Sequence, residues 1–447
     1  MTVAGRGFRP LRLAARAMLL AFGLSGLGAW TPGSALPVMM GTAWADDDGA
    51  SGSDDGGGSD SGGDGPTAGD SSEGLGNAPR RPAIRVVPER FLADELIAIQ
   101  PSPAALQRAQ TLMGAQVLGT ARLPRLGMTV VRLGLHGIDP VTARDVLNER
   151  DAGVFALHHL VGIAQDATPS APCEGPACTP KRVLQWPLDS RTCGIGQRVG
   201  MVDTAVDTRH PALRQARIQT RDWVSSGRHA VQDGHGTAIA AMLVGQPGSV
   251  YEGLLPQATL LAAHPFFAMP SGQVRADTWG LLHSLEWLAR EGVTVIGLSL
   301  TGDDDPALAL AMARLQSLGI VVVAAAGNGG QRAGPAYPAA YPGVLAATAI
   351  TPQTGPYRRA NRGDYIQYAL PGANLTIVTA DGGLTQGSGT SYAVPFLVGV
   401  IAQSAREGLV DRQNWALGQG VPRRDLGAPG KDAVFGWGLP QVPVRCR

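Results

Sequence analysis

The feature that most constrains the fold is the alternation of strand-like and helix-like segments along the C-terminal half of the chain. Short apolar runs rich in Val, Ile and Ala are separated by segments with the spacing of buried helices. The expected strands are 198–202, 259–263, 294–300, 321–325 and 344–349, and the expected helices are 238–243, 276–290, 306–318 and 392–406. This alternation predicts an α/β domain, in which helices cover both faces of a mostly parallel sheet. Such sheets carry their active sites at the carboxyl ends of the strands.

Three polar residues lie where such a fold would place chemistry. Ser391 follows a glycine and a threonine in the stretch 389–395, Asp203 follows a buried strand, and His235 lies in the glycine-lined turn 233–237. A serine hydroxyl is a weak nucleophile unless a base takes its proton, and the base needs an orienting carboxylate. Each residue alone could be structural, as a helix cap, a turn residue or a strand-end cap. Together, in the order Asp, His, Ser, they predict a catalytic triad.

A fourth stretch, 324–328, ends an apolar strand in Asn328, whose side-chain amide could donate a hydrogen bond to an oxyanion. With these four motifs in this order, residues 198–438 resemble the subtilases, the subtilisin-like serine endopeptidases. The resemblance implies that Asp203 orients the base, His235 is the general base and acid, and Ser391 attacks the scissile carbonyl. It also implies hydrolysis of peptide bonds through an acyl-enzyme without a cofactor. No calcium site can be assigned by matching residues.

The resemblance further implies that polypeptide substrates bind as an added strand, which gives backbone affinity without strong sequence choice. The implied substrate-binding residues are Leu298, Ser299 and Leu300 on one edge, Ala325 and Gly327 on the opposite wall, and Ala336 as the floor of an apolar specificity pocket. Four residues, Gly297, Thr301, Tyr392 and Phe396, differ from those commoner in close relatives, and Phe396 stands where the motif usually has histidine. These departures concern the shape of the subsites and leave the chemistry intact.

Two other functions compete with proteolysis. A catalytically silent exported binding or scaffold protein could use the same fold, but no triad residue has been lost. An esterase is suggested by the Gly-x-Ser-x-Ala pattern, and the order of the triad argues against it. Asp207 is a rival carboxylate to Asp203, and His158, His159 and His210 are expected to be structural. The formal net charge of +1 gives no reason to expect nucleic acid as a partner.

The N-terminal region predicts export. Arginines without acidic residues in 1–16, an apolar run, and the small-residue pattern of Ala43 and Ala45 indicate a signal peptide over 1–45. An uncleaved anchor is the alternative, although the apolar run is short for a membrane span. Residues 46–79 are Asp, Gly and Ser with almost nothing apolar, which predicts a disordered acidic linker. The protein is therefore expected to be secreted or periplasmic, with no stable membrane span after cleavage.

Residues 80–165 show a β-α-β-β-α-β rhythm, which predicts a small α+β, ferredoxin-like domain. Its position before a subtilase-like domain implies the family's inhibitory pro-domain, acting as an intramolecular inhibitor. The alternative is an ordinary small domain with a separate binding role. Residues 166–191 are expected to be a connector with the maturation site, cut by the chain itself between about Gln165 and Cys178, and 192–447 to be the catalytic domain.

Four cysteines, an even number in an exported chain, suggest two disulfides among three possible connectivities. Cys173 with Cys178 is the simplest local loop, which leaves Cys193 to pair with Cys446. That second bridge would tie the start of the catalytic domain to the C-terminus. Free buried thiols are the alternative, and no spacing suggests a zinc site.

Overall fold

The computed structural model describes residues 89–165, 180–187, 189–225 and 228–446. The expected signal peptide, acidic linker, most of the connector and the pair Cys173 and Cys178 lie outside these ranges. Within them, no helix is both long and apolar enough to cross a membrane.

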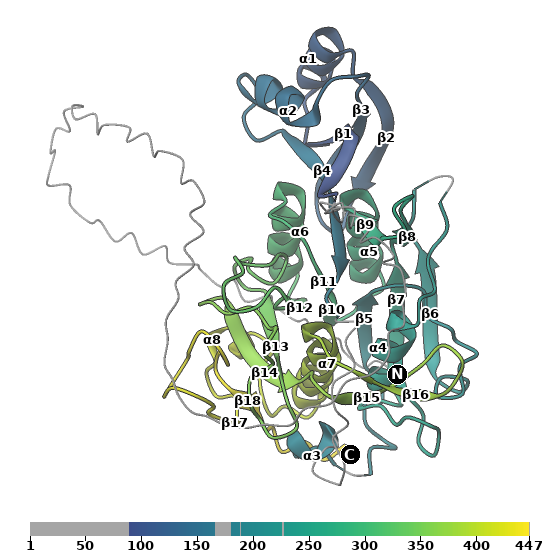
Figure 1. Ribbon diagram of the computed structural model, residues 1–447, viewed down its shortest axis with the longest axis vertical. Helices are drawn as coiled ribbons and strands as arrows, with labels where there is room; N and C mark the ends of the chain where they lie inside the picture. The colour runs from purple at the N-terminus through teal and green to yellow at the C-terminus, as the bar shows by residue number, and fades with distance from the viewer. Residues whose placement is uncertain (1–88, 166–179, 188, 226–227, 447) are drawn as a thin grey trace, which may run out of the picture. The chain divides into compact units, whose positions relative to one another are not determined.

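A seven-stranded parallel sheet forms the centre of the C-terminal domain (Figure 1), which confirms the predicted parallel sheet, although the strands at its two edges were not expected. Its strands, in spatial order, are β14 (Ile366–Pro371), β13 (Leu345–Ile350), β12 (Val321–Ala325), β10 (Val295–Leu298), β5 (Arg198–Val202), β7 (Thr259–His264) and β6 (Arg217–Asp222). Parallel strands need crossover connections, and helices form several of them, as the alternation in the sequence predicts. The strand order reverses beside β5, which puts Asp203 at the switch of the sheet.

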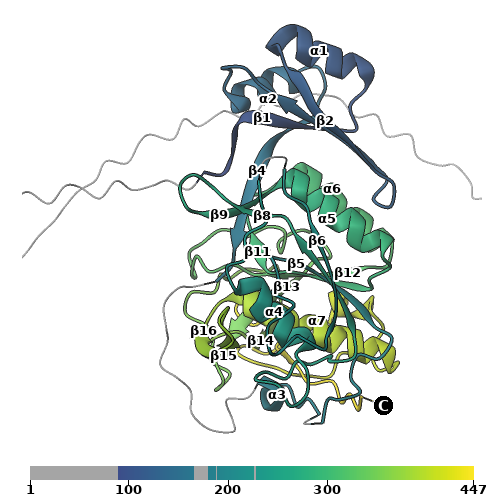
Figure 2. The same ribbon diagram turned by 90° about the vertical axis from the view of Figure 1, so that its right-hand side faces the viewer.

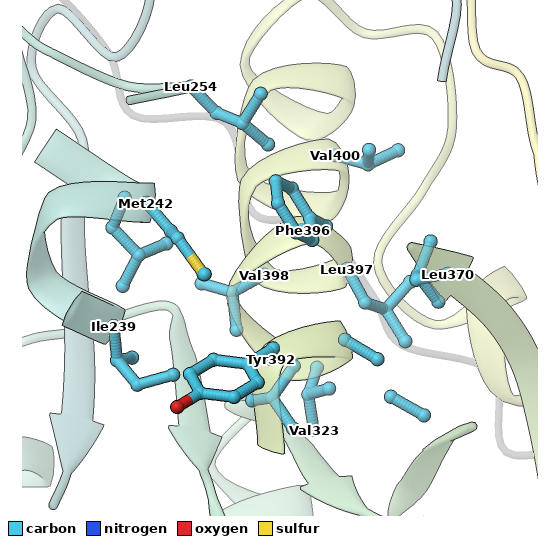
Figure 3. Packing of buried hydrophobic residues seen from close by; sticks show 14 of the residues in the cluster. Ile239, Met242, Leu254, Val323, Leu370, Tyr392, Phe396, Leu397, Val398 and Val400 are labelled. Atoms are coloured by element: carbon cyan, nitrogen blue, oxygen red, sulfur yellow. The ribbon is translucent and has the colours of Figure 1, made fainter. Parts of the chain in front are cut away.

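Helices cover both faces of the sheet (Figure 2). One core contains α4 (His235–Val244) and α7 (Thr390–Arg406), and the other contains α5 (Thr278–Arg290) and α6 (Pro306–Ser317). Alternate residues of β12 supply the two cores, with Val323 and Ala325 on the first face and Val322 and Ala324 on the second. Figure 3 shows α7 enclosed by apolar side chains from α4 and from the sheet. Ser391 therefore sits on a buried helix that packing holds rigidly.

Residues 91–163 form the predicted ferredoxin-like unit. Its strands are β1 (Phe91–Ile99), β2 (Gln116–Leu123), β3 (Met128–Gly134) and β4 (Phe155–Ile163), antiparallel in the order β2-β3-β1-β4. Helices α1 (Pro103–Met113) and α2 (Pro140–Asn148) pack on one face. Each helix starts with a proline at its first position, after an N-cap side chain, Ser102 or Asp139, that accepts a backbone hydrogen bond.

Strand β4 continues beyond this unit and joins the C-terminal domain. It pairs antiparallel with β9 (Val274–Asp277), which in turn pairs with β8 (Phe266–Ala268), and with β11 (Leu300–Thr301). These pairings correct two expected elements. Val274–Asp277 is a strand, so the helix expected from 276 begins at Thr278, and the strand expected over 294–300 is interrupted at Ser299.

Shorter elements complete the domain: α3 (Pro180–Val183), α8 (Asn414–Leu417), the hairpin of β15 (Leu375–Val378) and β16 (Leu384–Gly387), and the pair β17 (Arg423–Arg424) and β18 (Leu439–Pro440). The structure contains a disulfide between Cys193 and Cys446, 253 positions apart, with a Cα–Cα distance of 4.4 Å. Glu407 also holds the C-terminal segment, because its carboxylate accepts the backbone N–H groups of Arg445 and Cys446.

Candidate active site

The three residues predicted to form a triad meet at the carboxyl edge of the parallel sheet. Nδ1 of His235 lies 2.7 Å from Oδ1 of Asp203, and Nε2 of His235 lies 3.0 Å from Oγ of Ser391. All three residues are at most 3% exposed. A carboxylate at Nδ1 places that proton on the ring and leaves Nε2 free to accept the serine proton. The rival carboxylate, Asp207, instead pairs with Arg209 at the surface.

Local backbone features bring His235 to Asp203. Asp203 follows β5 directly, and its N–H continues the sheet by donating to Ala263. His235 is the first residue of α4, after Gly234 in a left-handed conformation. A Cβ on Gly236 would lie 2.0 Å from the carbonyl oxygen of Thr204, so only glycine lets α4 come this close to the loop after β5.

A supporting network that the sequence reasoning missed holds the Asp–His pair. The hydroxyl of Thr204 lies 2.6 Å from Asp233 and accepts a hydrogen bond from the N–H of Gly236. Asp233 also accepts the N–H of His235, and the N–H of Thr204 donates to Asp203. Both residues adjoin the predicted motifs, but a pairing across 29 positions leaves no local signal in the sequence.

Pro395 explains how Ser391 is anchored. A proline inside a helix cannot donate to the carbonyl four positions earlier, which here belongs to Ser391. The hydroxyl of Ser299 supplies the missing donor, 3.1 Å from that carbonyl oxygen. Ser299 was predicted to line the substrate edge, and its hydroxyl is used here to satisfy the Ser391 carbonyl. Ser391 therefore sits in the first turn of α7, where the helix dipole favours negative charge.

Two donors converge on one carbonyl oxygen beside Ser391. Nδ2 of Asn328 lies 2.8 Å from the carbonyl oxygen of Ala164, and the N–H of Ser391 lies 3.1 Å from the same atom. Oδ1 of Asn328 accepts the N–H and the hydroxyl of Thr390, which turns its amide nitrogen toward Ala164. A Cβ on Gly389 would lie 2.7 Å from the same carbonyl oxygen, so glycine keeps this position open. These groups are arranged as an oxyanion hole would require, with two donors on one carbonyl oxygen.

The segment that supplies this carbonyl lies in the expected substrate position. Ile163 pairs with Leu300 and Gly162 with Thr301, and the N–H of Ala164 donates to the carbonyl of Ser299. This is strand addition to the edge formed by β11. The bond next to the oxyanion hole is Ala164–Gln165, just ahead of the connector in which the maturation site was expected.

The remaining predicted substrate-binding residues divide into two groups. Gly327 and Ala336 are neighbours, since a Cβ on Gly327 would lie 3.0 Å from that of Ala336. Leu298 and Ala325 belong to β10 and β12, and their side chains are buried in the two cores of the domain. Phe396 is likewise a core residue of α7 (Figure 3).

Tyr392, the residue after Ser391, contacts both His235 and Gln165. Its ring centroid lies 5.3 Å from that of His235, and its hydroxyl lies 3.0 Å from Oε1 of Gln165. Burial, together with the charges of Asp203 and Asp233, raises the pKa of Tyr392 well above its usual range. The hydroxyl is therefore neutral and can donate at physiological pH. From the sequence, Tyr392 could be identified only as a residue that departs from the family motif.

Among the described residues, no group of three or more His, Cys, Asp or Glu side chains is arranged to hold a metal ion.

A parallel α/β sheet that presents aspartate, histidine and serine in this order, with an asparagine at the oxyanion position, defines the subtilisin-like class of proteins. The sequence model of the Subtilase family matches residues 194–438, so the chain belongs to this family. It is 29% identical over 321 residues to the minor extracellular protease Epr of Bacillus subtilis, an alignment that covers 69% of this chain and 48% of that protein.

Two further likenesses agree with this assignment. The chain is 32% identical over 212 residues to the thermostable alkaline protease of Halalkalibacterium halodurans, covering 47% of this chain and 56% of that protein. The chain thus spans about half the length of the curated relatives it matches. Fervidolysin from Fervidobacterium pennivorans, a keratinolytic enzyme related to subtilisin, has a TM-score of 0.62 at 18% identity, covering 79% of this chain and 60% of that one. At this identity the likeness shows the fold.

Proposed function

We propose that this chain is an exported serine endopeptidase made as a zymogen that cleaves its own Ala164–Gln165 bond. One observation carries the proposal: the carbonyl of Ala164 accepts hydrogen bonds from Asn328 and Ser391 while the hydroxyl of Ser391 is bonded to His235. These contacts support the proposal because they bring together a peptide bond, a hydroxyl, an imidazole and two hydrogen-bond donors. Acyl transfer requires this arrangement.

The reaction follows from the contacts. Oγ of Ser391 attacks the carbonyl carbon as its proton passes to Nε2 of His235, and Asp203 stabilises the resulting imidazolium. The carbonyl oxygen gains negative charge, which Nδ2 of Asn328 and the N–H of Ser391 hold. The imidazolium then protonates the leaving amide nitrogen, the C–N bond breaks, and an ester to Ser391 remains. Water, deprotonated by His235, hydrolyses this ester and restores the serine.

The ferredoxin-like unit, in this proposal, is a pro-domain that inhibits the enzyme until maturation. Several contacts support a specific complex. Glu286, near the C-terminal end of α5, accepts the backbone N–H groups of Arg125 and Leu126 at 3.2 and 3.1 Å. Arg90 forms an ion pair with Asp303. Because β4 also fills the substrate edge, the same segment would exclude other substrates as long as it stays bound.

Labelling with a fluorophosphonate probe tests the catalytic assignment. The matured wild-type protein should react at one serine, and Ser391→Ala should abolish labelling. Ser404→Ala is the matched control, because Ser404 lies on the same helix and its hydroxyl donates to Ile401 away from the site. Labelling that survives in Ser391→Ala would place the nucleophile elsewhere. Matured wild-type protein that does not label would favour a silent scaffold.

A further inference from the structure

The starting observation is that a tyrosine with a buried ring follows the nucleophile. Tyr392 is 3% exposed and belongs to the core around α7. Figure 3 shows its ring beside Ile239, with the hydroxyl at the end farthest from α7. A buried tyrosine hydroxyl normally finds a hydrogen-bond partner. Here the partner is Gln165, at 3.0 Å, so the hydroxyl reaches the segment that occupies the substrate position.

The register of that segment identifies the subsite. The carbonyl of Ala164 occupies the oxyanion hole, so Gln165 is the residue immediately after the bond that Ser391 faces. Its side chain belongs to the leaving part of a substrate. Ala164 itself is buried, whereas Gln165 is exposed apart from its contact with Tyr392. The hydroxyl therefore supplies a directional contact to an otherwise open subsite.

The charges around the hydroxyl set which side chains fit. Tyr392 donates, so its partner must offer an acceptor oxygen. The tyrosine ring lies 5.3 Å from that of His235, whose Nδ1 is 2.7 Å from Asp203 and whose backbone N–H donates to Asp233, so two negative charges lie near the hydroxyl. The same negative charges oppose a carboxylate brought to this point. A neutral amide of the length of glutamine meets both conditions, whereas methionine has the length without the oxygen.

We propose that Tyr392 is a specificity-determining residue, which selects peptide substrates with glutamine immediately after the cleaved bond. This inference rests on the proposed protease function. It concerns which peptides are cleaved, whereas the triad determines whether any are cleaved.

The test uses internally quenched peptides with the chain's own sequence from Leu160 onward. They differ only in the residue after alanine, which is glutamine, methionine, glutamate or glycine. The kcat/KM values of matured wild type and Tyr392→Phe are measured for each. In wild type we expect glutamine to exceed methionine by about fivefold, the factor for one neutral hydrogen bond. In Tyr392→Phe the two should be equal. Glutamate should be cleaved more slowly than methionine by both enzymes, because the aspartates remain.

Ratios are compared within each enzyme, so a general change in turnover on losing the hydroxyl cancels, and the glycine peptide reports that change separately. An equal glutamine-to-methionine ratio in the two enzymes would overturn the role of Tyr392, and so would glutamate cleaved as fast as glutamine. Failure of the protease function itself gives a different result: matured wild type would cleave none of the peptides and would not react with the fluorophosphonate.

Discussion

The side-chain amide of Asn328 donates a hydrogen bond to the carbonyl oxygen of Ala164, a residue 164 positions earlier in the chain. This contact joins the two folded parts of the molecule at the point where the chemistry would occur. It depends on β4 pairing with β11 in one register, because a shift of one residue would turn the Ala164 carbonyl away from Asn328. Strand pairing therefore determines which peptide bond faces Ser391.

The first prediction concerns that bond. Expressed for export in a protease-deficient host, wild type should mature to a chain that begins at Gln165. Ser391→Ala should remain a precursor that begins at Asp46, because the nucleophile is missing. Intact mass and N-terminal sequencing of both proteins measure the outcome. A wild-type N-terminus within 166–191 would show that the register in the structure is not the one cleaved, and maturation of Ser391→Ala would rule out self-cleavage.

The second prediction concerns the oxyanion hole. Asn328→Ala should lower kcat on a peptide substrate by about 10²–10³, a magnitude measured in subtilisin, a relative of this chain. Thr390→Val is the graded comparison, since it removes only one of the two donors that orient the Asn328 amide. Thr390→Val should lower kcat by about two- to tenfold. An unchanged kcat for Asn328→Ala would remove Asn328 from the mechanism.

The sequence predicted the parts of the site that depend on local structure. Asp203 at a strand end and Ser391 at a helix start could be located because strand and helix termini have sequence signals. The predicted fold class is also confirmed, because it rested on the same local signals of strands and helices. The edge strand β6 was missed because it is mostly polar and exposed, without the apolar run that marks a buried strand.

Contacts between distant segments could not be predicted. The maturation site was expected between about Gln165 and Cys178 because residues 166–179 have the composition of a linker, and which bond is cut stays a prediction. The bond that faces Ser391 in the structure depends instead on the pairing of Ile163 with Leu300. The contact between Tyr392 and Gln165 spans 227 positions. No local pattern in either segment contains that information.

The third prediction concerns the disulfide between Cys193 and Cys446. The bridge closes a loop of 253 residues and so restricts the unfolded chain. This stabilises the folded state by about 5 kcal/mol in the loop-entropy model, whereas disulfides typically contribute about 2–4 kcal/mol in practice. A reductant should therefore lower the Tm of the Ser391→Ala precursor, which cannot digest itself. A variant that also carries Cys193→Ala and Cys446→Ala should have a lower Tm than this precursor even without reductant. Any further fall in its Tm when reductant is added would come from Cys173 and Cys178. Equal Tm values for the two precursors under oxidising conditions would contradict a stabilising bridge.

The fourth prediction concerns a buried histidine between the two folded parts. His158 is fully buried, with Nδ1 2.8 Å from Glu95 and Nε2 3.8 Å from Asp277. Burial alone would lower its pKa, but hydrogen bonds and charges from Asp277 and Glu95 outweigh burial and raise the pKa to about 9. The backbone N–H of Trp279 also lies 3.3 Å from Nε2 and donates to it when the ring is neutral.

Two arginines also contact these carboxylates and reduce their attraction for the protonated ring of His158. Arg132 lies 3.2 Å from Glu95, and Arg228 lies 3.6 Å from Asp277. The raised pKa indicates that the two carboxylates still dominate at His158. The charged histidine is thus one member of a buried network of both signs, and its loss would leave two carboxylates with less compensation.

The direction of the pH dependence follows from the raised pKa. His158 binds its proton more tightly in the folded precursor than in the unfolded chain, whose ordinary value is about 6.5. Its stabilising contribution is fully present below pH 6.5 and is lost as the pH rises through about 9. The Tm of the Ser391→Ala precursor should therefore fall between pH 6.5 and 9, by an amount corresponding to a few kcal/mol at about 1.4 kcal/mol per pKa unit. Adding His158→Gln should lower Tm at pH 6 and flatten this fall, whereas His136→Gln, at an exposed histidine, should leave both unchanged. The same decline with and without His158→Gln would show that other groups cause it, and the buried network would then carry no pH dependence of its own.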